Sequence, residues 1–161
     1  MRMRKIKILT GPKGHGKSSL LRKQYAGREG ADGILTLRRD MDQRDFQLLS
    51  SGQTWPMEGE EGYSGPWLKV GRFCFSEEAF RRAEKFLLEA ASAEKNHTLI
   101  IDEIGPLELG GEGFFRVLRI LLDQVNGLDL ILVVRSELLK EVQQFFGLET
   151  AEVLTCDSFE E

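Results

Sequence analysis

A glycine-rich segment at residues 11–18 constrains the fold of this chain more than any other feature. It reads Gly-Pro-Lys-Gly-His-Gly-Lys-Ser, follows the short run Ile-Lys-Ile-Leu at residues 6–9 and precedes a helix-like stretch at residues 19–25. The pattern G-x-x-x-x-G-K-[S/T] between a strand and a helix is typical of a phosphate-binding P-loop. Glycine permits the positive φ angles and the close approach to an anion that a Cβ atom would block. The segment therefore predicts a strand–loop–helix unit that binds phosphate.

Individual residue types in this loop predict individual contacts with a triphosphate. The Lys17 ammonium is expected to reach the β- and γ-phosphates, and the Ser18 hydroxyl to coordinate Mg²⁺, which prefers oxygen ligands. Lys13 and His15 occupy variable positions where only the backbone is needed, and His15 is expected to be exposed and without a catalytic role. The predicted phosphate-binding residues are Gly11, Pro12, Lys13, Gly14, His15, Gly16, Lys17, Ser18 and Ser19.

The other strand signals indicate a mostly parallel sheet. Apolar segments recur at residues 33–37, 98–101 and 128–134, and a weaker one lies at residues 151–154. Several are continuously apolar rather than alternating, as expected for strands that are buried on both faces. Because helical patterns separate them, we expect an α/β three-layer sandwich with helices on both faces of one central sheet.

Three helices are expected between these strands. One begins after Ser76, a suitable N-cap, and runs to about residue 93. A second covers residues 114–125 and ends at Asn126-Gly127. A third is expected to be capped by Ser136 and to stop at Gly147.

Residues 38–72 break the alternation of strands and helices. They hold both tryptophans, Trp55 and Trp67, and a turn-rich stretch at residues 58–66. Short antiparallel strands with a flexible loop are expected here. The segment is either a lid over the binding site or a surface hairpin that two tryptophans anchor.

Composition restricts the class of protein. A chain of 161 residues with 41% hydrophobic residues is expected to form a single domain, residues 1–161. The net charge of -4 and pI near 5.4 give no overall attraction for nucleic acid or an anionic membrane. With no apolar run of transmembrane length, no visible signal peptide, and two cysteines that lack metal-ligand spacing, we expect a cytoplasmic protein.

A pair of acids follows the apolar run at residues 98–101. Asp102 and Glu103 are expected near the P-loop, because ligands gather at the carboxyl ends of parallel strands. Asp102 would hold Mg²⁺, through a water molecule, and Glu103 would accept a proton from the attacking water or orient it. The two acids thus predict a site for hydrolysis of a nucleoside triphosphate.

The segment Asp-Glu-Ile-Gly-Pro-Leu-Glu-Leu at residues 102–109, together with residues 11–18, resembles the small THEP1-type nucleoside-triphosphatases. The resemblance covers most of the chain and implies a RecA-like P-loop NTPase sheet. It also implies slow, Mg²⁺-dependent hydrolysis of ATP, GTP and other nucleoside triphosphates with weak base preference. By position, it gives Asp102 the role of metal-associated acid and Glu103 that of catalytic acid. Glu108 recurs in the family signature and is either a third functional acid or a tether for its loop.

Several arginines and one glycine are further candidates for contact with the γ-phosphate. Arg135 follows the strand at residues 128–134, so it should emerge at the same edge as the P-loop and stabilise the transferring phosphoryl group. The alternative for Arg135 is an ordinary surface arginine; Arg38, Arg39 and Arg72 are weaker candidates. Gly105 completes a D-x-x-G pattern, in which the glycine N–H binds the γ-phosphate.

Two other functions remain open besides hydrolysis. A nucleotide or small-molecule kinase would replace water with an acceptor hydroxyl, although no arginine occurs at residues 54–66. A nucleotide-gated partner or assembly protein would use the triphosphate as a switch, so a protein partner is not excluded. The sequence contains no Asn/Thr-Lys-x-Asp tetrapeptide, the guanine-reading motif of Ras-type GTPases, and weak base selectivity is expected.

Overall fold

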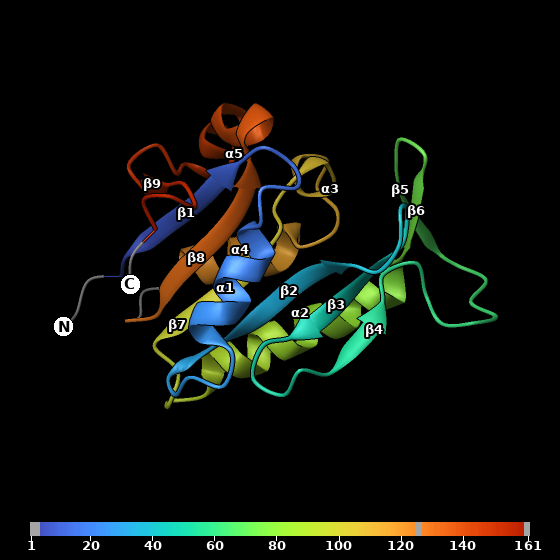
Figure 1. Ribbon diagram of the computed structural model, residues 1–161, viewed down its shortest axis with the longest axis horizontal. Coiled ribbons are helices and arrows are strands. Elements are labelled where there is room, and N and C mark those ends of the chain that lie inside the picture. Colours follow the sequence, from blue (N-terminus) through green and yellow to red (C-terminus); the bar gives the residue numbers. More distant parts are fainter. Residues whose placement is uncertain (1–3, 125–126, 160–161) are drawn as a thin grey trace.

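The computed structural model describes residues 4–124 and 127–159, and a seven-stranded sheet forms its centre (Figure 1). The strands are β1 (Ile6–Gly11), β2 (Ala31–Arg38), β3 (Arg44–Leu48), β4 (Thr54–Pro56), β7 (Thr98–Asp102), β8 (Asp129–Arg135) and β9 (Glu152–Leu154). Their order across the sheet is β4-β3-β2-β7-β8-β1-β9. Pairing is parallel from β2 to β9 and antiparallel at the β3–β4 edge. The predicted α/β class with a mostly parallel sheet is confirmed.

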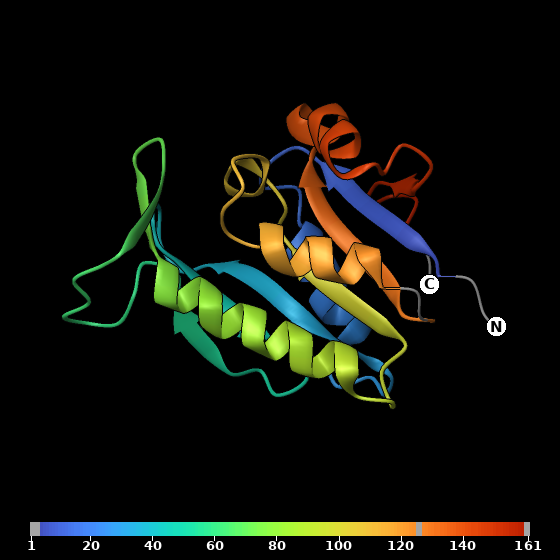
Figure 2. The same ribbon diagram turned by 180° about the vertical axis from the view of Figure 1, so that it is seen from behind.

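Helices cover both faces of this sheet. Figure 1 shows α1 (Lys17–Tyr25) in front of the strands, and Figure 2 shows α2 (Glu77–Ser92) and α4 (Phe115–Asp123) on the opposite face. Residues of α5 (Leu139–Phe146) belong to the same apolar cluster as α2 and α4. The expected three layers are therefore present.

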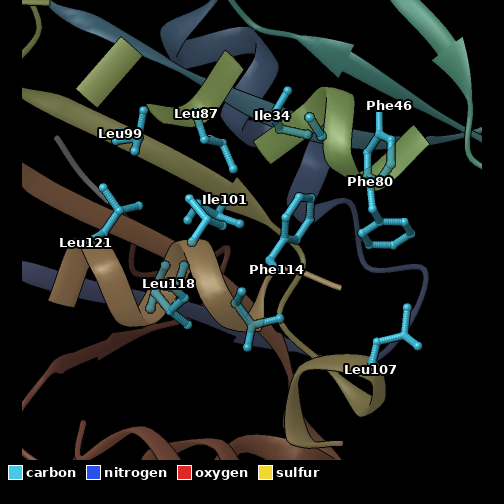
Figure 3. Packing of buried hydrophobic residues seen from close by; sticks show 14 of the residues in the cluster. Ile34, Phe46, Phe80, Leu87, Leu99, Ile101, Leu107, Phe114, Leu118 and Leu121 are labelled. Carbon is cyan, nitrogen blue, oxygen red and sulfur yellow. The ribbon is translucent and has the colours of Figure 1, made fainter. Parts of the chain in front are cut away.

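The central strands are buried on both sides, as their continuous apolar sequence predicts. All five residues of β7 are buried. Successive side chains point to opposite faces of the sheet. Ile101 packs in the cluster that contains Leu87 of α2 and Leu118 of α4 (Figure 3). Its neighbour Ile100 packs instead in the cluster that contains Leu21 of α1.

The segment at residues 38–72 forms short antiparallel strands, as expected. Two of them, β3 and β4, extend the main sheet, whereas β5 (Trp67–Val70) pairs with β6 (Phe73–Ser76) in a separate hairpin that projects from the body of the molecule (Figure 1). Trp55 is buried, and its Nε1 donates a hydrogen bond to the Ala79 carbonyl at 3.0 Å. Trp67 is 40% exposed, so only one tryptophan anchors the segment in the core. A lid role stays a prediction.

Two of the predicted helix ends are confirmed, and one predicted N-cap is wrong. Ser76 caps α2, since its Oγ accepts a hydrogen bond from the Ala79 N–H at 3.0 Å, as predicted. The predicted cap at Ser136 is wrong: Ser136 opens a 3₁₀ turn, η1 (Ser136–Leu138), and α5 begins after it without a side-chain cap. Gly147 ends α5 with φ 68°, as expected.

Two further differences concern residues 103–127. The predicted end of the second helix at Val125 and Asn126 lies outside the described residues, and α4 is described to Asp123. A short helix, α3 (Pro106–Leu109), was not expected.

In residues 4–124 and 127–159, no helix combines the length and apolarity needed to span a bilayer.

Candidate active site

The sheet order brings three sequence-distant strand ends to one edge. β8 lies between β1 and β7, and all three run parallel. Their register pairs Gly11 with Arg135 and Asp102 with Val133. The P-loop, the acid pair and Arg135 therefore emerge at neighbouring points of the carboxyl edge, where ligands of open α/β sheets bind.

The loop after β1 has the backbone geometry that its glycines predict. Gly14 and Gly16 have φ angles of 83° and 78°, in the left-handed region that disfavours other residues. The Lys17 ammonium donates hydrogen bonds to the carbonyls of Gly11 and Pro12 at 3.0 and 2.9 Å. An ammonium has three donors, so a further one is free for a ligand oxygen. These two bonds hold the Lys17 side chain, at the start of α1, against the P-loop.

Asp102 is the acid that joins the two halves of the site. Its Oδ2 accepts hydrogen bonds from the Ser18 hydroxyl and, at 3.1 Å, from the Thr36 N–H. Thr36 also donates through its hydroxyl to the Asp102 carbonyl at 2.6 Å. Burial and, to a smaller extent, the charge of Glu103 raise the pKa of Asp102 to about 7, while its hydrogen bonds act in the opposite direction. Sequence analysis missed Thr36, although it lies in the predicted strand at residues 33–37.

Glu103 and Arg135 face each other beside this acid. The Arg135 Nε and the Glu103 Oε1 are 3.6 Å apart, an ion pair beyond hydrogen-bond distance. The Arg135 Nη1 lies 3.7 Å from the Oε1 of Glu137. The Arg135 Nε is itself buried and has no hydrogen-bond partner among the described residues. An unsatisfied buried donor of this kind is suited to an anionic ligand.

These groups line one cleft of about 450 Å³. Its lining includes the following predicted residues: Lys13, Gly14, His15, Gly16, Lys17, Ser18, Ser19, Asp102, Glu103 and Arg135. Gly11 and Pro12 do not line the cleft, and they contribute the carbonyls that hold Lys17. Arg22, Thr36, Arg38 and Arg44 also line it, and of these only Arg38 was considered from sequence. His15 is exposed, as expected.

Gly105 does not belong to this cleft. Its N–H donates to the Glu108 Oε1 at 2.8 Å, and the Phe114 N–H donates to the Oε2 of the same carboxyl group at 2.8 Å. Because the Gly105 N–H is already used, the structure does not support its predicted contact with the γ-phosphate. Glu108 is 3% exposed, and burial raises its pKa to about 7. These contacts favour a role for Glu108 as a tether of its loop over a role as a third functional acid.

The oxygen atoms near the P-loop fit a magnesium ion. Ser18 and Asp102 present a hydroxyl and a carboxyl oxygen that are in direct contact. No group of three or more His, Cys, Asp or Glu side chains is placed to hold a metal within residues 4–124 and 127–159. Mg²⁺ in phosphoryl-transfer sites takes one or two protein oxygens and completes its shell with phosphates and waters. The donor set matches that demand.

Comparisons with known proteins support the fold and identify the family. A solved structure of THEP1 from the hyperthermophile Aquifex aeolicus superposes with a TM-score of 0.69 and 19% sequence identity, covering 94% of this chain and 89% of that one. The mouse protein named cancer-related nucleoside-triphosphatase homolog is 29% identical over 125 residues. That match covers 70% of this chain and 66% of the mouse protein, just under two thirds of its length. A family model described as NTPase matches residues 6–157. The predicted similarity to THEP1-type proteins is thereby confirmed, and the chain belongs to the NTPase family.

Proposed function

We propose that this protein is a Mg²⁺-dependent nucleoside-triphosphatase that releases the terminal phosphate of ATP, GTP and related nucleotides. The contact between the Ser18 hydroxyl and the Asp102 carboxyl group carries the proposal. It joins a P-loop to an acid at the end of a neighbouring parallel strand, inside a cleft that Glu103 and Arg135 also line. Family membership and the name of the mouse relative support the same activity.

Each group has a role that follows from its position. The N–H groups of the P-loop and the Lys17 ammonium bind the phosphates. Ser18 and Asp102 would hold Mg²⁺, which would supply positive charge that offsets the negative charge of the triphosphate oxygens. The Glu103 carboxylate accepts the proton of the attacking water, and Arg135 stabilises the charge that develops on the γ-phosphoryl group.

Weak selectivity for the base is part of the proposal. The side chains that line the cleft are of types that bind phosphate and metal, and the guanine-reading tetrapeptide is absent from the sequence. Phosphates are common to all nucleoside triphosphates, so a site built around them accepts several bases. We also propose a cytoplasmic location, which the two free thiols Cys74 and Cys156 support.

Phosphate release from ATP, GTP, CTP and UTP, with Mg²⁺ or with EDTA, tests the proposal. We expect turnover of all four nucleotides that requires the metal. Glu103→Gln should retain nucleotide binding and lower kcat by about 10²-fold or more, the scale of a lost general base. Glu137→Gln is the matched control, because Glu137 also pairs with Arg135 but does not line the cleft.

Equal kcat values for the Glu103 and Glu137 variants would remove Glu103 from the reaction. Equal turnover with Mg²⁺ and with EDTA would show that the reaction does not need Mg²⁺. The absence of turnover with every nucleotide, together with measurable binding, would favour the nucleotide-gated partner over the enzyme. Transfer of the γ-phosphoryl group to an acceptor other than water is a second candidate function, because a second cavity, of about 230 Å³, adjoins the nucleotide cleft.

A further inference from the structure

A second cavity, of about 230 Å³, lies beside the nucleotide cleft and has a different lining. Its walls are mainly apolar side chains from β3, β6, α2, α3 and the residues that follow β4 and precede α4, and we call it the aromatic pocket. These side chains include Phe46, Met57, Phe75, Phe80, Leu107 and Phe114. The ring centroids of Phe46 and Phe80 are 4.9 Å apart, and those of Phe80 and Phe114 are 5.2 Å apart (Figure 3).

The aromatic pocket and the nucleotide cleft adjoin and share part of their lining. Five residues line both cavities: Lys13, Thr36, Arg44, Glu103 and Arg135. Glu103, the proposed base, therefore stands at the boundary between them. A molecule in the aromatic pocket would present its polar end to the side of the cleft where water attacks.

The rim of the aromatic pocket is positively charged. The ring of Phe73 lies within cation–π range of Lys13, Arg44 and Arg72, at 5.9, 5.0 and 5.3 Å from the ring centroid. The pKa of Lys13 lies below its ordinary value, chiefly because of the charge of Arg44, with a smaller effect of burial. Arg72 pairs with Asp42 at 2.7 Å, but both side chains are exposed, so this pair is weak. The rim thus favours an anionic group.

The volume limits the size of an occupant. An apolar cavity of about 150 Å³ binds benzene, so about 230 Å³ holds one ring with short substituents. Val70 and Phe73, which are partly exposed, contribute apolar surface for that ring, the buried rings of Phe46, Phe80 and Phe114 lie behind it, and the cations of the rim contribute the charge. The combination matches a small monoanion with a one-ring body and no second ring.

We propose that the aromatic pocket is a phosphoryl-acceptor site for a small organic anion that carries a hydroxyl group. The assignment rests on the proposed function, since the nucleoside triphosphate supplies the phosphoryl group. The hydroxyl oxygen of the occupant forms a bond to the γ-phosphorus, and the bond from that phosphorus to the β,γ-bridging oxygen breaks. The nucleoside diphosphate leaves with the electron pair of that bond, and the hydroxyl proton passes to Glu103. Hydrolysis is the same step with water in place of the occupant.

Binding is tested first, without nucleotide, by NMR of methyl-labelled methionine with benzoate and the three isomers of (hydroxymethyl)benzoate as probes. Met57 lines the aromatic pocket, whereas Met41 is 73% exposed and does not line it. We expect the methyl resonance of Met57 to shift in a saturable manner, while that of Met41 stays in place. No shift at Met57 with any probe would overturn the proposal.

Two arginines give a matched pair of variants. Arg72 lines the aromatic pocket alone, and Arg22 lines the nucleotide cleft alone. Arg72→Gln should raise the Kd of the probes by about threefold, the scale of one exposed charge contact, and Arg22→Gln should leave that Kd unchanged. Equal effects of the two variants would reject the proposed anion contact at the rim.

Transfer is tested by ³¹P NMR with MgATP and each (hydroxymethyl)benzoate isomer. We expect a phosphomonoester to form with at least one isomer, and to disappear with Glu103→Gln. Benzoate, which has no hydroxyl group, should occupy the position of the attacking water and lower phosphate release. Probes that bind at Met57 while phosphate passes only to water would reject the acceptor role. Phosphate release without a probe reports hydrolysis separately, so the two proposals can fail independently.

Discussion

Replacement of Asp102 by Asn separates the function of this acid from its effect on stability. Asp102 is 2% exposed, and burial raises its pKa to about 7, whereas an aspartate in an unfolded chain has a pKa of about 3.9. The folded state therefore binds the proton more tightly than the unfolded state. Stability from this group is full below pH 4 and is lost as the pH rises through 7. A difference of about 3 pH units corresponds to about 4 kcal/mol lost above pH 7.

Asn carries no titrating proton, so the variant lacks this loss. The substitution also weakens the hydrogen bonds to Ser18 and Thr36, which costs about 1–3 kcal/mol at every pH. At pH 8 we therefore expect Asp102→Asn to be more stable than the original chain by about 1–3 kcal/mol. At pH 4 the sign reverses, because the original carboxyl group is protonated there and only the weaker hydrogen bonds of the variant remain.

Urea unfolding between pH 4 and pH 8, with EDTA and without nucleotide, measures this difference. Comparison of the two chains at each pH cancels other titrating groups, including Glu108. A variant that is destabilised equally at both ends of the range would refute the inference that Asp102 is held in a desolvated, proton-favouring site. In a parallel titration, Mg²⁺ should tighten nucleotide binding by the original chain and not by the variant.

Three further substitutions test other parts of the structure. Arg135→Gln should lower kcat for phosphate release by about 10²-fold with little change in KM, the scale of one lost electrostatic contact in the transition state; an unchanged kcat in steady-state assays would place Arg135 outside the reaction. At pH 4, where the Glu108 carboxyl group is protonated in the folded chain, Glu108→Ala leaves the buried N–H groups of Gly105 and Phe114 without their acceptor and should lower the free energy of unfolding by about 2–6 kcal/mol, so a urea midpoint near the original value at that pH would contradict the tether. Ser76→Ala removes the N-cap of α2 and should cost about 1 kcal/mol by the same measurement, whereas no loss would show that the cap is dispensable.

The parts of the fold that the sequence predicts are those with a local signal. Residues 98–101 are continuously apolar because β7 is covered on both faces, and that burial is visible in the sequence itself. The positive φ angles of Gly14 and Gly16 follow from the same loop that marks the phosphate site. Asp102 was placed near this loop because parallel strands end at a common edge.

The parts that were missed depend on contacts between distant segments. The order of elements along the chain does not show that β8 lies between β1 and β7 in the sheet. The sequence predicts Arg135 at the edge where the P-loop lies, but its direct pairing with Gly11 follows only from that sheet order. Thr36 and Arg44 reach the cleft because β2 pairs with β7 on one side and with β3 on the other. The aromatic pocket likewise combines side chains from segments that carry no common motif. In the sequence, each apolar side chain of this pocket is indistinguishable from an ordinary core residue.

Asp102 and Glu108 show why a raised pKa does not by itself identify a catalytic acid. Burial raises the pKa of both to about 7, and both are nearly inaccessible to solvent. Both carboxyl oxygens of Glu108 accept hydrogen bonds from backbone N–H groups, which cannot turn to another acceptor. The Oδ2 of Asp102 accepts from one backbone N–H, that of Thr36, and from the Ser18 hydroxyl, which can rotate to make room for a cation. At pH 4, where both carboxyl groups are protonated in the folded chain, a larger loss of stability is expected for Glu108→Ala than for Asp102→Asn, because Ala leaves two backbone N–H groups without an acceptor whereas Asn retains an acceptor oxygen.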